Sequence, residues 1–215
     1  MEVKKPTQLA ALRHWLSGSR YLLCVDLEAT CDDYPPGLSP EEQAFYELQV
    51  PRNEMETIEV GAVLLDLQAE CSVVVEFSRF VRPLLHPRLT SFCQELTTIH
   101  QGDVDLADGY ALVAAELQEL LSPYNQDGGV QWCSWGEYDR KQLVTDAARL
   151  GCAPMLDPDK HCSMKRWHWK LYACKGMGLR PAAESLGLGW QGTHHRGIDD
   201  ARNLAVVVKH MAQSQ

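Results

Sequence analysis

The segment Tyr21-Leu22-Leu23-Cys24-Val25-Asp26-Leu27-Glu28 decides the fold, because an apolar run here ends in two acids. Residues 21–27 have the composition of a buried strand. Residues two apart in a strand point to the same face, so the Asp26 and Glu28 carboxylates point the same way. Like charges held this close repel, and a divalent cation would offset the repulsion directly. A solvated strand end, or arginine partners for the two acids, would also account for the pair.

The elements predicted around this strand combine a hairpin with a strand and helices further along the chain. Residues 57–67 and 72–81 predict two strands joined by a polar turn, which makes an antiparallel hairpin. Residues 130–135 predict a short strand, and residues 137–150 predict the helix that follows it. The other predicted helices cover residues 7–18, 41–48, 88–96, 109–121, 166–175, 180–186 and 198–211. This order predicts an α/β fold in which helices pack on one mixed sheet.

The composition is that of a globular protein with one sizeable core: 215 residues, of which 45% are hydrophobic and 23% charged. No stretch approaches the ~18 apolar residues needed to cross a membrane, and the first residues lack the apolar segment of a secretory signal. The eight cysteines form no C-x-x-C pair, and several lie in apolar runs, which predicts small buried side chains. We therefore expect a cytoplasmic protein with no disulfide and no membrane partner.

The net charge of −9 is unevenly distributed along the chain. Residues 160–180 carry six Lys or Arg side chains and no Asp or Glu, interleaved with Trp167, Trp169 and Tyr172. A solvated helix face that buries its aromatic side chains would explain this basic aromatic segment. Beside a phosphodiesterase site, a surface that follows the phosphates of a nucleic acid would explain it equally well.

Two further acids lie near predicted helix starts. Asp139 follows the strand at 130–135 and the turn residue Gly136, and the helix dipole alone would favour an acid there. Asp200 shares a helical stripe with Leu204 and Val207, which should face the core. A carboxylate on the flank of a core-facing stripe needs a partner.

His195 precedes Asp200 by five residues. On a regular helix, five residues subtend about 140° around the axis, so the two side chains could not face one site. His195 must therefore lie on the preceding loop, and we expect Gly197 to let that loop fold back. This arrangement places a mobile imidazole beside an anchored carboxylate. His194 is the competing candidate, and a solvated loop histidine is the simpler alternative.

Taken together, Asp26-x-Glu28, Asp139 and His195-x4-Asp200 resemble the pattern of the DEDDh 3′→5′ exonucleases, DnaQ-like members of the ribonuclease H-like superfamily. The segments at 25–31, 80–83, 89–97 and 195–203 are similar to the "enhanced RNAi" or 3′ histone-mRNA exonuclease subfamily. The resemblance implies a single-domain ribonuclease H-like fold with a mixed five-stranded sheet, its first three strands antiparallel and its last two parallel. Residues 20–213 would form the exonuclease domain, and residues 1–19 an N-terminal helical extension.

The resemblance also implies the chemistry and its residues. Two Mg²⁺ ions per site, for which Mn²⁺ can substitute, would be held by the carboxylates of Asp26, Glu28, Asp139 and Asp200. His195 would act as the general base that takes the proton of the attacking water. The catalytic set would thus be these four acids and His195, and hydrolysis from the 3′ end would release nucleoside 5′-monophosphates.

An exonuclease must also bind the end of its substrate. By resemblance, the groups that contact the terminal nucleotide are Glu28, Ala29, Thr30, Phe92, Leu96 and His195. Phe92 and Leu96 are four residues apart on a predicted helix and share one face, where a base could stack, although both would also suit the core.

The expected substrates are single-stranded RNA 3′ ends and short or structured RNA. A DNA 3′-exonuclease or proofreading-type nuclease would use the same acids on single-stranded DNA. A non-catalytic RNA-binding module on the same fold is a second alternative, but the intact set of five residues argues against it. A plain α/β scaffold would leave the carboxylates near the core without partners.

Overall fold

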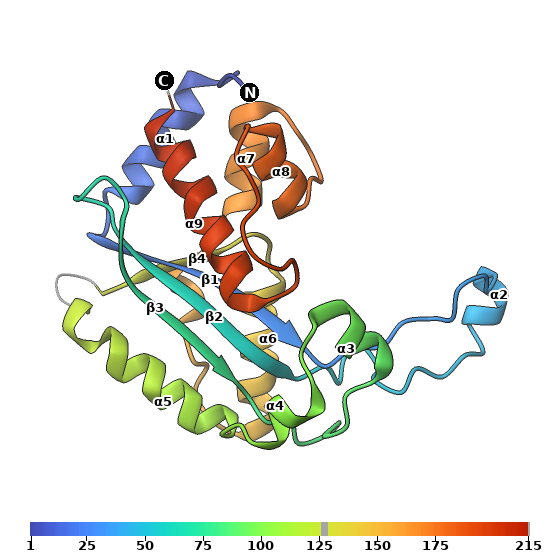
Figure 1. Cartoon of the computed structure of the whole chain (residues 1–215). Coiled ribbons are helices and arrows are strands. Elements are labelled where there is room, and N and C mark those ends of the chain that lie inside the picture. Colours follow the sequence, from blue (N-terminus) through green and yellow to red (C-terminus); the bar gives the residue numbers. More distant parts are fainter. Residues whose placement is uncertain (126–128, 215) are drawn as a thin grey trace.

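A five-stranded mixed sheet forms the centre of the structure, a computed structural model that describes residues 1–125 and 129–214 (Figure 1). The strand order is β3-β2-β1-β4-β5. The strands are β1 (Tyr21–Ala29), β2 (Thr57–Asp66), β3 (Ser72–Phe80), β4 (Gln131–Ser134) and β5 (His161–Ser163). β1, β2 and β3 pair antiparallel, whereas β4 and β5 run parallel to β1. The predicted fold class and sheet are confirmed.

Helices cover both faces of the sheet (Figure 1). One face carries α1 (Pro6–Leu16), α7 (Met164–Tyr172), α8 (Leu179–Ser185) and α9 (Gly197–Gln213). The other carries α5 (Tyr110–Leu121) and α6 (Tyr138–Leu150). The short helices α2 (Pro40–Gln43), α3 (Ser91–Thr97) and α4 (Gln101–Asp105) lie beyond the ends of β1, β2 and β3. Within the described ranges, no helix has both the length and the apolar character needed to span a bilayer.

The side chains of β1 alternate between the two cores, as the strand geometry requires. Leu22 and Cys24 pack on the face with α9, and Leu23, Val25 and Leu27 pack on the opposite face with α5 and α6. Asp26 and Glu28 continue the row of Leu22 and Cys24, so both carboxylates point to the α9 side. Both faces are covered, which explains why the strand is apolar at successive positions rather than at every second one.

The N-terminal helix is part of the main core. Leu9, Leu12 and Leu16 of α1 are buried in the same apolar cluster as the side chains of α7 and α9. Lys4 N–H also donates a hydrogen bond to the carbonyl of Leu171 at 2.9 Å, which fixes the start of the chain against α7.

Several element boundaries differ from the predicted ones for local reasons. The helix predicted at 88–96 starts at Ser91, because Thr90 adopts an extended conformation and its hydroxyl accepts a hydrogen bond from Cys93 N–H. The helix predicted at 41–48 is shorter, Pro40–Gln43, with a capping box from Ser39 and Glu42. No residues were assigned to the short elements α4 and β5, since three to five residues give no periodic pattern, and a fifth strand was expected only from the family resemblance.

Helix α9 approaches β2 very closely through two glycines. A Cβ at Gly61 would overlap the carbonyl of Gly197 and the amide nitrogen of Ile198. A Cβ at Gly197 would lie 3.1 Å from both the carbonyl oxygen of Asp26 and the amide nitrogen of Gly61. The contact fixes the start of α9, and so Asp200, against the strand that carries Asp26. Gly197 is therefore required for this close approach rather than for a loop that folds back.

Substitution of Gly61 by alanine is expected to destabilise the protein by about 3 kcal/mol or more, because the added methyl group meets only backbone atoms, which cannot move aside. Urea unfolding measures the loss. Gly102→Ala is the matched control: it lies in α4 with open space around the added methyl group, so its free energy of unfolding should change by less than about 1 kcal/mol. Equal stability of the two variants would show that the packing of α9 on β2 tolerates a side chain.

Candidate active site

A pocket of about 360 Å³ lies beside the carboxyl end of β1. Its walls come from β1, from the segment between β4 and α6, and from the loop and first turn of α9. The predicted catalytic residues all line it: Asp26, Glu28, Asp139, His195 and Asp200. The fold thus brings together side chains that are separated by more than a hundred residues in the sequence.

Asp26 and Glu28 have the geometry of unpartnered ligands. Glu28 is only 7% exposed, yet neither carboxylate has a hydrogen bond or ion pair with any residue in the described part of the chain. The two alternatives considered for this pair, a solvated strand end and arginine partners, therefore do not apply. Oxygen atoms of Asp26, Glu28 and Asp200 all lie within 4.8 Å of one another. Hard oxygen ligands at this spacing suit Mg²⁺ or Mn²⁺.

The electrostatics of the pocket favour the binding of a positive charge. Burial, followed by the charges of Asp139 and Glu28, raises the pKa of Asp26 well above its usual value. Burial and the charge of Asp200 raise the pKa of Glu28 to about 9. Four carboxylates in one pocket cannot all be ionised at neutral pH without a counter-charge. The donor set therefore fits a divalent cation.

Asp200 lies in the first turn of α9 and is 4% exposed. One carboxylate oxygen accepts a hydrogen bond from the backbone N–H of His195 at 2.9 Å. The other lies 3.3 Å from Nδ1 of His194. Burial raises the pKa of Asp200, as it does for its neighbours. The sequence predicted that this carboxylate needs a partner near the core. The loop immediately before α9 supplies that partner.

Asp139 holds the pocket wall against β1. It lies in the first turn of α6, is 5% exposed, and accepts a hydrogen bond from Leu27 N–H at 3.1 Å. Leu27 stands between Asp26 and Glu28, so this bond ties the third acid to the strand that carries the first two. Burial raises the pKa of the Asp139 carboxyl group. The helix dipole alone does not explain an acid bonded to another element.

The two histidines occupy the turn before α9, as the helical geometry predicted for His195. His195 has a left-handed backbone with φ of +62°, a conformation that costs energy for a side chain with a Cβ. The rings of His194 and His195 stack at 3.9 Å, and Trp190 packs edge-on against His194. The imidazole nitrogens of His195 have no hydrogen-bond partner among the described residues. Burial, with a smaller effect from His194, lowers the pKa of His195 and favours its neutral form.

A buried ion pair that the sequence did not reveal supports this turn. Glu59 of β2 is fully buried and lies opposite Glu28 in the sheet register. Its carboxylate accepts hydrogen bonds from Arg196 Nε at 3.1 Å and from Gly197 N–H at 3.0 Å. The interaction fixes both residues that follow His195. Glu59 occupies a strand with no distinctive spacing, so only the pairing register could have indicated its role.

The residues expected to bind a terminal nucleotide divide into two groups. Ala29 and Leu96 line the pocket, and Leu96 is 37% exposed on α3. Thr30 and Phe92 are outside the pocket wall. Thr30 is 1% exposed, and its hydroxyl accepts a hydrogen bond from Glu56 N–H at 2.9 Å. Tyr138, 44% exposed at the start of α6, lines the pocket and was not predicted, although it is adjacent to Asp139.

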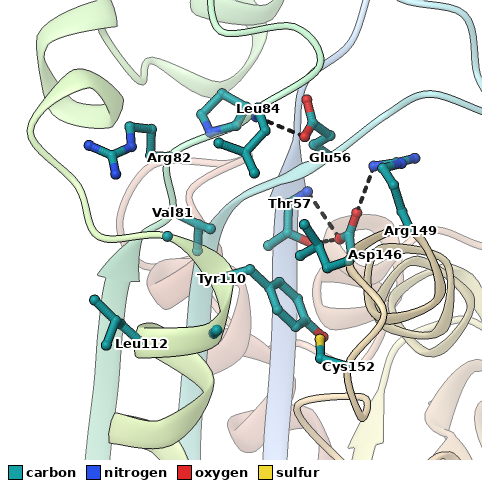
Figure 2. Close-up of a pocket in the computed structure, with 14 residues that line it drawn as sticks. Glu56, Thr57, Val81, Arg82, Leu84, Tyr110, Leu112, Asp146, Arg149 and Cys152 are labelled. Carbon is teal, nitrogen blue, oxygen red and sulfur yellow. Dashed lines mark hydrogen bonds and ion pairs between the residues drawn. The ribbon is translucent and has the colours of Figure 1, made fainter.

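A second pocket, of about 330 Å³, lies between α5, α6 and the segment after β3 (Figure 2). The carboxylates of its two acidic residues already accept hydrogen bonds from other protein groups. Glu56 accepts hydrogen bonds from three successive backbone amides, those of Leu84, Leu85 and His86. Asp146 is bound by Thr57 and by Arg149. These groups stabilise loops, and the pocket offers no free catalytic set in the described chain comparable to that at the end of β1.

Comparisons with known proteins agree on one family. The Exonuclease family model, RNase_T, matches residues 23–208, a range that includes all five candidate catalytic residues. The 3′-5′ exonuclease eri1 of Schizosaccharomyces pombe is 31% identical over 216 residues, which cover 89% of this chain and 68% of that protein. Human ERI1 exoribonuclease 3 is 28% identical, and the match covers 89% of this chain but only 53% of the human protein.

The fold also matches a solved nuclease structure. The nuclease domain of 3′hExo, a DEDDh family member bound to rAMP, aligns with a TM-score of 0.76 and 26% sequence identity. The alignment covers 91% of this chain and 92% of that domain. The chain and that nuclease domain therefore share their fold.

Proposed function

Because the chain belongs to the RNase_T exonuclease family and is an ERI1-like 3′→5′ exonuclease, we propose that it hydrolyses RNA from the 3′ end at the pocket beside β1. The proposed catalytic residues are Asp26, Glu28, Asp139, His195 and Asp200. The observation that carries this assignment is the pair of unpartnered carboxylates, Asp26 and Glu28, beside buried Asp200. The products are nucleoside 5′-monophosphates and an RNA shortened by one nucleotide.

Enzymes of this family depend on divalent metal ions, and the pocket supplies the ligands. We assign Mg²⁺ as the ion, two per site, with Mn²⁺ as a substitute. Asp26, Glu28 and Asp200 would hold one ion, and Asp139 would support the second. When bound, such ions neutralise the excess negative charge of the pocket and polarise the scissile phosphodiester.

Side chains of the protein then accept the proton of the attacking water and hold the accepting group in place. His195 is neutral near pH 7, because its pKa is lowered from 6.5, and its ring nitrogens are free to accept a proton from the attacking water. Asp200 and the turn fixed by Glu59 hold the backbone of His195 in its left-handed conformation. As the water oxygen bonds to phosphorus, the bond from phosphorus to the 3′-oxygen of the preceding nucleotide breaks. That oxygen takes a proton from solvent, and His195 later returns the proton of the attacking water to solvent.

We propose that the pocket wall also selects the end of the strand. Ala29 and Leu96 present an apolar surface beside Glu28, on which a terminal base can pack without sequence preference. In this proposal the Glu28 carboxylate, which lines the same pocket, also accepts a hydrogen bond from the 3′-hydroxyl. A 3′-phosphate would bring a second anion into the acidic pocket, so RNA with a free 3′-hydroxyl is the proposed substrate.

Oligonucleotides labelled at one end test this assignment. With Mg²⁺, single-stranded RNA carrying a 5′ label should shorten in single-nucleotide steps, whereas a 3′ label should leave at once as a mononucleotide. A matched DNA oligonucleotide should react at least about tenfold more slowly. Faster hydrolysis of DNA than of RNA would show that DNA, not RNA, is the preferred substrate. Binding of RNA without any release of mononucleotides would indicate a non-catalytic binding module.

A further inference from the structure

A second groove adjoins the candidate active site and carries the opposite charge. Its volume is about 370 Å³, and Gly136 lines both this groove and the catalytic pocket. Glu137 also lines the groove, and all the other lining residues belong to the basic aromatic segment 160–180. They are Ser163, Lys165, Arg166, Trp169, Lys175 and Gly176. The function of this segment was left open between a solvated helix face and a phosphate-binding surface.

The charges in the groove are arranged for an anion. Three cations, Lys165, Arg166 and Lys175, face one carboxylate, that of Glu137. Glu137 already pairs with Arg140 at 3.2 Å and with Arg166 at 3.4 Å, so its charge is largely compensated. Neither Lys165 nor Lys175 forms an ion pair with a residue that the structure describes. Neither ammonium group is therefore neutralised by a carboxylate in the described chain, so both charges are available to phosphates.

The groove also offers an aromatic surface. Trp169 is 45% exposed, although most tryptophan side chains are largely buried. The Lys175 ammonium lies over the Trp169 ring, 5.5 Å from the ring centroid, so the cation and the aromatic side chain belong to one surface. In contrast, Trp167 is half-buried against the core and Tyr172 is fully buried. The solvated-face explanation fits those two side chains but not Trp169.

We infer that this groove binds the RNA strand on the 5′ side of the scissile phosphate, with Trp169 stacking on a base and Lys165 and Lys175 contacting phosphates. The inference rests on the proposed function, because the strand must enter the catalytic pocket at Gly136. The acidic pocket, which binds cations, and the basic groove beside it would bind different parts of the RNA. The pocket holds the terminal nucleotide, and the groove holds the remainder of the chain.

The test compares a trinucleotide RNA with a decanucleotide RNA as substrates of the whole protein. The wild type should have a higher kcat/KM on the decanucleotide than on the trinucleotide. Trp169→Ala should lower the ratio of the decanucleotide value to the trinucleotide value by about tenfold. Trp169→Phe should restore most of the ratio, since it keeps a stacking ring. Lys209→Glu, on an exposed position of α9 away from the groove, is the charge control and should leave the ratio unchanged.

A double variant, Lys165→Gln with Lys175→Gln, tests the charges independently of the tryptophan. Each phosphate contact to a single strand contributes about 0.7 to the slope of log affinity against log salt concentration. The slope of log(kcat/KM) on the decanucleotide should therefore become shallower by about 1.4, with thermal unfolding unchanged. This variant keeps the proposal testable if Trp169→Ala fails to fold.

The outcomes separate the two proposals. If the wild type hydrolyses neither RNA, the proposed function fails. If it hydrolyses both with equal kcat/KM, or if the groove variants keep the wild-type ratio and salt slope, the groove does not bind RNA while the proposed function stands.

Discussion

Asp26→Asn is expected to lower the rate of 3′-end hydrolysis by about 10³-fold or more while the protein remains folded. The carboxylate has no protein partner in the described chain, so its loss breaks no internal bond but removes a ligand shared by the cation site. Loss of about 4 kcal/mol of transition-state stabilisation, a plausible share for a metal site, corresponds to that factor. Single-turnover hydrolysis of a 5′-labelled RNA measures the effect. Asp159→Asn makes the same chemical change at an exposed site and should have wild-type activity.

The same variant should be more stable than the wild type when no metal is present. The folded-state pKa of Asp26 is raised above 3.8, so the folded protein holds this proton more tightly than the unfolded chain does. The resulting stability is present below about pH 3.8 and is lost as the pH rises towards the folded-state pKa. At pH 7 the folded protein has therefore lost part or all of this stability, and asparagine, which does not titrate, removes the pH-dependent cost.

Thermal unfolding at pH 7 measures the stability of the metal-free protein in EDTA and the stabilisation that Mg²⁺ adds. Asp26→Asn should have the higher Tm in EDTA, and Mg²⁺ should raise the Tm of the wild type more than that of the variant. A variant that unfolds at a lower temperature in EDTA would show that Asp26 has a structural role instead.

His195→Ala is expected to have the second large effect, a loss of 10²- to 10⁴-fold in kcat, the usual range for a general base. Apart from its stack on His194, the imidazole has no polar contact in the described chain, since its nitrogens have no hydrogen bond to a described residue. The fold and the affinity for Mn²⁺ should therefore be retained, which calorimetric titration of Mn²⁺ can measure.

His194→Ala is the matched comparison for His195. The His194 ring packs between Trp190 and His195 and contacts Asp200, so we expect it to position its neighbours. Its replacement should lower kcat by about 10- to 100-fold, the size of effect found for groups that orient a ligand. If His194→Ala is the more damaging change, the base is His194 and the assignment of the turn is wrong.

The parts of the fold that the sequence predicts are those with a strong local pattern. The buried strand ending at Asp26 and Glu28, the hairpin at 57–81 and the long helices follow from apolar runs and periodicity. The placement of His195 follows from the angle per residue in a helix, and the structure has it in the turn before α9. The positive φ at His195 was not predicted, since Gly197, two residues further on, was the residue expected to let the loop fold back.

The parts that could not be predicted depend on contacts between distant segments. Glu59 gains its importance from the strand register and from Arg196, which lies 137 residues away. Strand β5 exists only because residues 161–163 pair with β4. The basic aromatic segment shows the same limit, since its composition left two explanations, and the exposure of Trp169 in a groove beside the pocket favours the second.

The most direct test of the central claim is the release of mononucleotides from a 3′-labelled RNA, measured first in EDTA and then after addition of Mg²⁺. The acidic pocket predicts no release in EDTA, because the unpartnered carboxylates repel the phosphodiester, and full recovery with Mg²⁺ or Mn²⁺. Release that continues unchanged in EDTA would contradict a metal-dependent exonuclease at this site.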